Sequence, residues 1–125
     1  MRREERLTSP QQYAAVYSKG ISRVSRLLVM RALPNGLPLT RFGFSVSKRV
    51  GGAVVRNRLK RRLREILPVL PVKSAWDLVF IVRPPAADAD FATLKVTVEH
   101  LLAQGNLIKS DSGGTRIGEE AAGEL

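Results

Sequence analysis

Six of the nine residues from Arg56 to Arg64 are arginine or lysine, and none of the nine is acidic. Like charges four residues apart destabilise a helix, and the alternating glutamates of an ordinary solvated helix are missing here. Arginine is also the side chain best suited to two-pronged contacts with phosphate. The chemistry that this run offers is therefore phosphate binding, and nucleic acid is the favoured partner.

Charge is divided unevenly along the 125 residues. Residues 1–64 carry 16 Lys or Arg and two acids, a net charge of +14, whereas residues 65–125 have a net charge of −4. The window from Arg41 to Arg64 holds nine basic residues and no acid. Repulsion of this density lowers folding stability unless a polyanion neutralises it. A membrane surface is a weaker alternative, because no long amphipathic basic helix or lipidation signal is evident.

Residues that could perform catalysis are scarce. The absence of cysteine excludes disulfides, iron–sulfur clusters and thiolate nucleophiles. His100 is the single histidine, and Asp88 and Asp90 are better placed to cap a helix than to bind metal. We assign no catalytic residue, and the metal ligands stay unknown. No apolar run of about 18 residues or signal peptide is present, so we expect a cytoplasmic protein.

The cationic run is expected on a helix from about Ala53 to Leu67, which ends before Pro68. At 100° per residue, six apolar side chains fall within an arc of about 120° and form the core face: Val55, Leu59, Leu63, Ile66, Leu67 and Leu70. Three polar side chains lie opposite this face: Asn57, Arg61 and Arg64. The remaining cations occupy the two flanks, Arg56 and Lys60 on one and Arg58 and Arg62 on the other.

The segment before this helix alternates as a strand from Arg41 to Ser47. Its core face is expected to carry Phe42, Phe44 and Val46, and its other face Arg41, Gly43, Ser45 and Ser47. Lys48, Arg49 and two glycines then lead into the helix. The glycines can admit a phosphate to the backbone, or they can simply form a turn. The spacing does not match a phosphate-binding P-loop.

Tyr13 and Tyr17 share one face of an earlier helix, which Ser9 and Gln12 are expected to start as a capping box. Both rings can belong to the core. Alternatively, they line a cleft against the small polar face of the Arg41–Ser47 strand, where unpaired bases or sugars stack. The residues leave both possibilities open.

The remaining segments complete a single α+β domain. Gly20 is expected to end the first helix in the left-handed conformation. Residues 24–33 and 76–82 are expected to form strands, with a possible third strand near Ser22, and residues up to about Gln104 a last helix. The expected order is α-β-β(-β)-α-β-α, a compact sandwich. We expect residues 1–8 to be flexible, residues 9–104 to form the domain, and residues 105–125 to be a disordered tail.

The 24 residues from Phe42 to Glu65 resemble the signature of the protein subunit of bacterial ribonuclease P. In that family a strand ending S-V-x-K-[KR] is followed by a glycine turn and A-V-x-R-N-R-x-K-R-x-x-R on a helix. Every one of these positions is met here. The resemblance extends over residues 6–104, including Arg6, Leu7 and the two tyrosines.

The resemblance implies an α/β sandwich with a left-handed β-α-β crossover, which is the rare hand. It implies an endonuclease that removes the 5′ leader of precursor tRNA, in which a separate catalytic RNA with magnesium performs the cleavage. The RNA-binding positions that it implies are Lys48, Arg49, Arg56, Asn57, Arg58, Lys60, Arg61, Arg62 and Arg64. The leader cleft would contain Tyr13, Tyr17, Arg31, Ser45 and Ser47. Arg31 stands where relatives often have an aromatic residue, so phosphate contact could replace stacking there.

Three other functions are weighed against this one. A ribosomal-protein-like RNA binder would share the basic helix without preferring a leader. A DNA-binding helix-turn-helix fits less well, because strands flank the basic helix. A nuclease that acts without RNA would need clustered acids or paired histidines, which this chain lacks.

Overall fold

The computed structural model describes residues 1–109 as three α-helices, four strands and three short 3₁₀ turns. The strands are β1 (Ile21–Val24), β2 (Leu28–Pro34), β3 (Arg41–Val46) and β4 (Trp76–Val82). The helices are α1 (Pro10–Lys19), α2 (Ala53–Ile66) and α3 (Phe91–Gln104). The 3₁₀ turns are η1 (Arg3–Glu5), η2 (Leu67–Val69) and η3 (Pro84–Asp88). The predicted mixed α+β domain is confirmed.

The four strands form one sheet in the order β1-β2-β4-β3. β2 pairs antiparallel with both of its neighbours, and β3 pairs parallel with β4. Parallel neighbours need a crossover connection, and α2 supplies it. The left hand of this crossover stays a prediction. The predicted strand over residues 24–33 is confirmed as β2, and the possible strand near Ser22 is confirmed as β1. Only the predicted start at Val24 is wrong, because Ser25 N–H donates to Leu28 O (2.8 Å) and turns the chain between β1 and β2.

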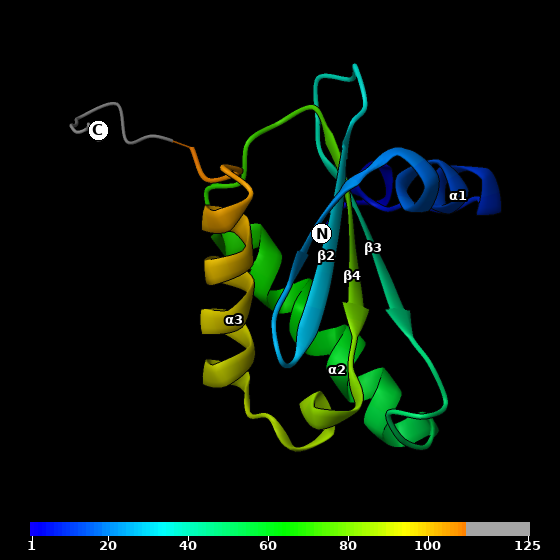
Figure 1. Ribbon diagram of the computed structural model, residues 1–125, viewed down its shortest axis with the longest axis vertical. Coiled ribbons are helices and arrows are strands. Elements are labelled where there is room, and N and C mark those ends of the chain that lie inside the picture. The colour runs from blue at the N-terminus through cyan, green and yellow to red at the C-terminus, as the bar shows by residue number, and fades with distance from the viewer. Residues whose placement is uncertain (110–125) are drawn as a thin grey trace.

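Two layers of helices cover the sheet (Figure 1). α2 and α3 lie on one face, and α1 lies across the other. The main core fills the space between the sheet and α2 with α3, and a smaller cluster beneath α1 contains Leu7, Val16 and Val79. β4 contributes to both, since Leu78 and Phe80 face the main core and Val79 faces α1. This explains why its sequence is apolar on both faces, as expected for a strand inside a sheet.

Helix caps explain where the elements begin. Ser9 Oγ accepts from Gln12 N–H (3.2 Å) and Gln12 Oε1 accepts from Ser9 N–H (3.1 Å), which confirms the predicted capping box. Asp90 Oδ1 accepts from Thr93 N–H (2.8 Å) at the start of α3. The prediction of a left-handed Gly20 is wrong, because its φ is −76°. Glycine is needed there for space, since a Cβ would lie 2.5 Å from Val16 O.

The packed domain extends beyond both predicted boundaries. Arg6 bridges to Phe42 as a short parallel pair, and Leu7 is buried under α1, although residues 1–8 are predicted to be flexible. At the other end, Leu107 is fully buried and Ile108 bridges to Val72. The prediction that disorder begins at residue 105 is therefore wrong for these two residues. Both segments therefore add buried apolar side chains to the domain and increase the apolar area removed from water. The rest of the predicted disordered tail lies outside the described residues.

No helix among residues 1–109 combines the length and the apolar character needed to cross a membrane.

Candidate nucleic-acid interface

The α2 helix presents its cations away from the core as the helical wheel predicts. Leu59, Leu63 and Ile66 are fully buried. The three polar residues on the opposite face are all exposed: Asn57, Arg61 and Arg64. Arg56, Arg58, Lys60 and Arg62 on the two flanks are half-buried. Burial of the apolar stripe therefore holds a cationic face toward solvent.

One flank of α2 is hydrogen-bonded to the chain itself. Arg58 Nη2 donates to Ala87 O (3.2 Å), and Arg62 Nη1 donates to Ala89 O (2.9 Å). These carbonyls belong to η3 and the residue after it, which join β4 to α3. Arg58 and Arg62 thus fasten this connection to α2. The wheel could not show this, because η3 is distant in sequence.

The other flank of α2 meets β3, an edge strand of the sheet, where Lys60 shares a pocket with Phe42 and Phe44. The Arg64 guanidinium carbon lies 5.9 Å from the centre of the Phe44 ring, within the range of a cation–π contact. Lys60 and Arg64 line a pocket together with Arg6 and Tyr13. Sequence reasoning missed Arg6 as a site residue, although the family resemblance already extended to Arg6 and Leu7.

The turn between β3 and α2 adds two further cations. Lys48 and Arg49 are exposed, and the turn closes through Val50 N–H to Ser47 O (3.1 Å). A Cβ added to Gly52 would meet nothing within 4 Å, so space alone does not require glycine there. The turn therefore leaves the start of α2 open to solvent beside Lys48 and Arg49.

Tyr13 and Tyr17 lie on the opposite face of the sheet from α2. The Tyr13 ring lies directly over Gly43, where a Cβ would come within 2.7 Å of ring atoms. Tyr13 is half-buried in the small cluster under α1, whereas Tyr17 is 39% exposed. The two ring centres are 6.4 Å apart with a 37° tilt. Tyr13 is thus partly a core residue, and Tyr17 offers a free ring face.

A row of residues across the sheet lies next to these tyrosines. The strand register aligns Val29 with Ile81 and Ile81 with Ser45 on the α1 face. All three are only half-buried, so α1 leaves part of this face uncovered. Ser47 is exposed just past the end of β3. The structure therefore brings Tyr13, Tyr17 and Ser45 to one face, with Ser47 at its margin.

Arg31, which the family resemblance places in the leader cleft, is hydrogen-bonded to the end of α1. Its Nη2 donates to Tyr17 O (2.5 Å) and Gly20 O (3.2 Å), and its Nε donates to Val16 O (3.5 Å). These carbonyls end α1, where a positive charge also offsets the helix dipole. Arg31 therefore holds the C-terminal end of α1 against β2. Its guanidinium is directed at α1 and not along the sheet.

Arg41 forms the one ion pair of residues 1–109. Its Nε and Nη2 donate to Asp77 Oδ1 (2.9 Å) and Oδ2 (2.7 Å). Asn35 Nδ2 also donates to Asp77 Oδ1 (2.9 Å), which joins the turn after β2 to this pair. The hydrogen bonds to Asp77 raise the pKa of Arg41. Arg41 is thus neutralised within the fold, unlike the cations of α2.

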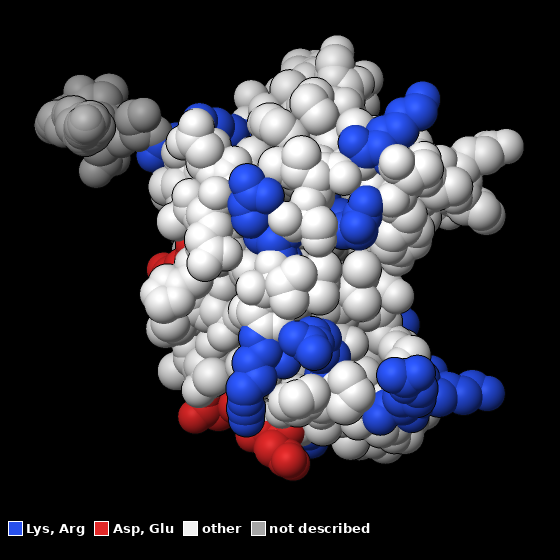
Figure 2. Space-filling view, viewed as in Figure 1, with Lys and Arg blue, Asp and Glu red and all other residues white. Residues whose placement is uncertain are grey.

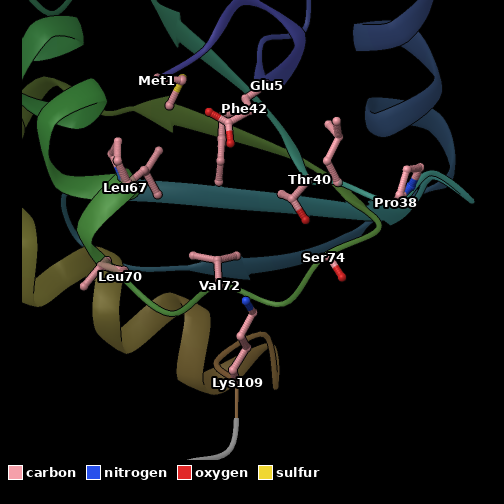
Figure 3. A pocket seen from close by; sticks show the side chains of 12 residues that line it. Met1, Glu5, Pro38, Thr40, Phe42, Leu67, Leu70, Val72, Ser74 and Lys109 are labelled. Carbon is pink, nitrogen blue, oxygen red and sulfur yellow. The ribbon is translucent and has the colours of Figure 1, made fainter.

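The surface as a whole is dominated by positive charge. Figure 2 shows Lys and Arg spread over the viewed face, with Asp and Glu mainly along its left and lower edges. A separate pocket, shown in Figure 3, is lined mostly by apolar residues such as Phe42, Leu67 and Val72. Glu5 and Lys109 are the charged residues that line it. That pocket lacks the cationic lining of the α2 surface.

The described residues offer no arrangement that fits a metal ion. No group of three or more His, Asp or Glu side chains within residues 1–109 could hold one. His100 is exposed on α3, and Asp90 is occupied as a helix cap. We therefore derive no chemical step through a metal held by this chain.

The described residues form a small α+β domain with a solvent-facing cationic helix and tyrosines on the opposite face of the sheet, a geometry and charge that suit nucleic-acid binding. The family model described as Ribonuclease P matches residues 1–105. The chain therefore belongs to the ribonuclease P protein family, whose members are components of the endoribonuclease of tRNA 5′ processing.

Individual relatives agree with this assignment. A ribonuclease P protein component of Dehalococcoides mccartyi is 45% identical over 108 residues, covering 86% of this chain and 90% of the relative. One from Caldanaerobacter subterraneus is 44% identical over 99 residues, covering 78% and 85%.

Solved structures show the same fold. The ribonuclease P protein of Staphylococcus aureus superposes with a TM-score of 0.78 at 31% identity, covering 84% of this chain and 98% of that one. The Thermotoga maritima protein gives a TM-score of 0.74 at 28% identity, covering 80% and 96%.

Proposed function

We propose that this chain acts in the cytoplasm by binding two RNAs, the catalytic RNA of ribonuclease P and precursor tRNA. The catalytic RNA contacts the turn before α2 and the exposed part of that helix. The 5′ leader of the precursor lies as a single strand on the sheet face beside α1. The RNA subunit, with magnesium, performs the cleavage, and the protein contributes binding.

The cationic face of α2 carries this proposal. Asn57, Arg61 and Arg64 are exposed, and none of the cations of α2 forms an ion pair with a residue in the described range. A helix that keeps uncompensated charges at four-residue spacing loses stability by itself. RNA phosphates would remove that repulsion and release counterions, so binding should weaken steeply with salt.

The α1 face of the sheet suits a single strand of RNA. The Tyr17 side chain is 39% exposed, and the half-buried row of Val29, Ile81 and Ser45 lies on the same face of the sheet. Stacking on an aromatic ring holds unpaired bases without demanding a particular sequence. A strand there would raise affinity for the precursor over the mature tRNA, which has no leader to place.

The division of labour follows from charge. Catalytic RNA and substrate repel each other as polyanions, and a protein with a strongly basic N-terminal half reduces that repulsion. Less magnesium is then needed to bring the two RNAs together. We assign the magnesium of the reaction to the RNA subunit, as the resemblance to the ribonuclease P protein family implies.

The first experiment is cleavage of precursor tRNA at low magnesium and near-physiological salt. It compares the protein alone, a bacterial ribonuclease P RNA alone, and the two together. Activity that appears only in the mixture supports the proposal. Activity of the protein alone would favour a nuclease that needs no RNA. Tight RNA binding without a gain in cleavage would favour a general RNA binder.

Tyr17→Ala tests the cleft separately. We expect weaker binding of leader-bearing precursor by the assembled enzyme and unchanged binding of mature tRNA, because only the leader stacks on this ring. Tyr17→Phe is the matched control, since it keeps the ring and should retain the affinity. Equal losses for both RNAs would show that Tyr17 only supports the fold.

A further inference from the structure

A pocket at the open edge of β3 joins the two surfaces of the proposed function. It has a volume of about 160 Å³ and lies between the N-terminal segment, α1, β3 and α2. Three of its lining side chains are the cations Arg6, Lys60 and Arg64. Three others are aromatic: Tyr13, Phe42 and Phe44. No acidic side chain lines it.

The three cations come from separate parts of the chain. Lys60 and Arg64 are one turn apart on α2, and Arg6 reaches the pocket because its segment bridges to Phe42. None of them forms an ion pair with any residue in the range 1–109. Three convergent, unneutralised charges repel one another, and an anion between them converts that repulsion into attraction.

The position of the pocket selects the kind of anion. Tyr13 lines the pocket and also lies over Gly43 at the start of the proposed leader cleft. β3 is an edge strand, so a chain leaving the sheet face past this edge would cross the pocket. A single-stranded RNA carries a phosphate at every nucleotide, each of which suits a guanidinium.

We propose that this pocket binds one backbone phosphate of the 5′ leader where the leader passes the edge of β3. Arg6, Lys60 and Arg64 surround the phosphate, and the cation–π contact with Phe44 keeps Arg64 in place. This inference rests on the proposed function and adds Arg6 to it. The N-terminal segment thereby becomes part of substrate recognition.

The test uses enzyme assembled from the full chain and the RNA subunit. Binding of precursor tRNAs with leaders of increasing length is compared for wild type, Arg6→Gln and Arg6→Lys. Arg3→Gln is the matched control, because it removes the same charge from the same segment and Arg3 does not line this pocket. Arg6 is exposed, so its substitution should leave the fold intact.

Arg6→Gln should weaken binding of precursors with long leaders by about five- to tenfold and leave binding of mature tRNA unchanged. Its log–log salt slope should fall by about 0.7, the contribution of one single-strand phosphate. Arg6→Lys should recover most of the loss, and Arg3→Gln should change affinity less than twofold. A methylphosphonate linkage replaces one leader phosphate with a neutral group. When that linkage occupies the pocket, Arg6→Gln should no longer lower the affinity for the precursor.

The proposal fails if Arg6→Gln leaves leader-dependent binding unchanged, weakens mature tRNA equally, or matches Arg3→Gln. These outcomes are distinct from failure of the proposed function, in which wild-type protein would not stimulate the RNA subunit at all. If wild type stimulates cleavage and prefers the precursor while Arg6→Gln does the same, only the pocket assignment is wrong.

Discussion

The two flanks of α2 carry the same kinds of side chain and have different surroundings. On one flank, Arg58 and Arg62 donate to the carbonyls of Ala87 and Ala89 and hold η3. On the other flank, Lys60 lines a pocket beside β3 that has no acidic lining residue, together with Arg64 from the adjoining exposed face. Cationic residues near each other in sequence thus divide into some that hold the fold and others that remain available to a partner.

The same division extends to other cations of the N-terminal half. Arg41 is paired with Asp77, and Arg31 donates to the carbonyls that end α1. Exposed cations such as Arg61 and Arg49 have no comparable partner within residues 1–109. A basic residue therefore contributes to RNA binding according to what its guanidinium already contacts, and counting charges alone overestimates the binding surface.

The largest effect is expected from Asp77→Ala, which removes the carboxylate that pairs with Arg41. The substitution leaves the donors of Arg41 and Asn35 without their acceptor in a largely buried place. The free energy of unfolding should fall by about 2–4 kcal/mol, measured by urea denaturation. RNA affinity of the protein that remains folded should stay unchanged. A loss below about 0.5 kcal/mol would show that this pair is not structural.

Arg61→Ala tests the exposed face of α2. Affinity for the catalytic RNA should fall about three- to tenfold, and the salt slope should flatten by about 0.9 for one lost contact with duplex RNA. Unfolding by urea should be nearly unchanged, because Arg61 makes no side-chain hydrogen bond to residues 1–109. An unaltered salt slope would contradict the assignment of this face to RNA.

Arg62→Ala tests the flank that faces η3. The change removes the donor to Ala89 O, so we expect the free energy of unfolding to fall by about 1 kcal/mol. The RNA salt slope should change less than in Arg61→Ala. Arg62 would instead belong to the RNA-binding surface if Arg62→Ala left stability intact and weakened RNA binding as much as Arg61→Ala does.

The smallest effect is expected at the cap of α3, next to the same flank. The hydrogen bond from Thr93 N–H lowers the pKa of Asp90, with a further contribution from the charge of Arg62. A depressed folded-state pKa adds stability above the unfolded value of about 3.9, and this stability is lost as pH falls through the folded pKa. Asp90→Asn keeps a cap of similar strength. The wild-type urea midpoint should fall as pH drops below about 4, and Asp90→Asn should reduce that fall. If the fall is the same in Asp90→Asn, Asp90 does not contribute to the pH dependence of stability.

The local predictions that succeeded depended on neighbours in sequence. The Ser9 capping box, the apolar stripe of α2 and the buried strand at Trp76–Val82 each follow from periodicity or from contacts within a few residues. The signature from Phe42 to Glu65 also identified the family that the comparison confirms. These features are encoded in short stretches, where backbone geometry limits the alternatives.

The predictions that failed depended on distant partners. Gly20 is extended, and glycine is needed there because the carbonyls of Val16 and Ala32, the second from distant β2, leave no space for a Cβ. Leu7 and Leu107 are buried because the sheet and the end of α3 lie beside them. Sequence reasoning placed Leu7 and Leu107 outside the domain. Leu7 lies between Arg6 and Thr8, Leu107 follows Gly105 and Asn106, and neither belongs to a periodic segment.

The sequence by itself determined the elements, the cationic face of α2 and the family. Only the tertiary structure decided which cations are already bound to the protein, because the acceptors at Asp77, Ala87, Ala89 and the end of α1 are far away along the chain. It also brought Arg6 to the pocket with Lys60 and Arg64. Helical periodicity orients a side chain relative to its own helix, whereas its hydrogen-bond partners depend on how the elements pack.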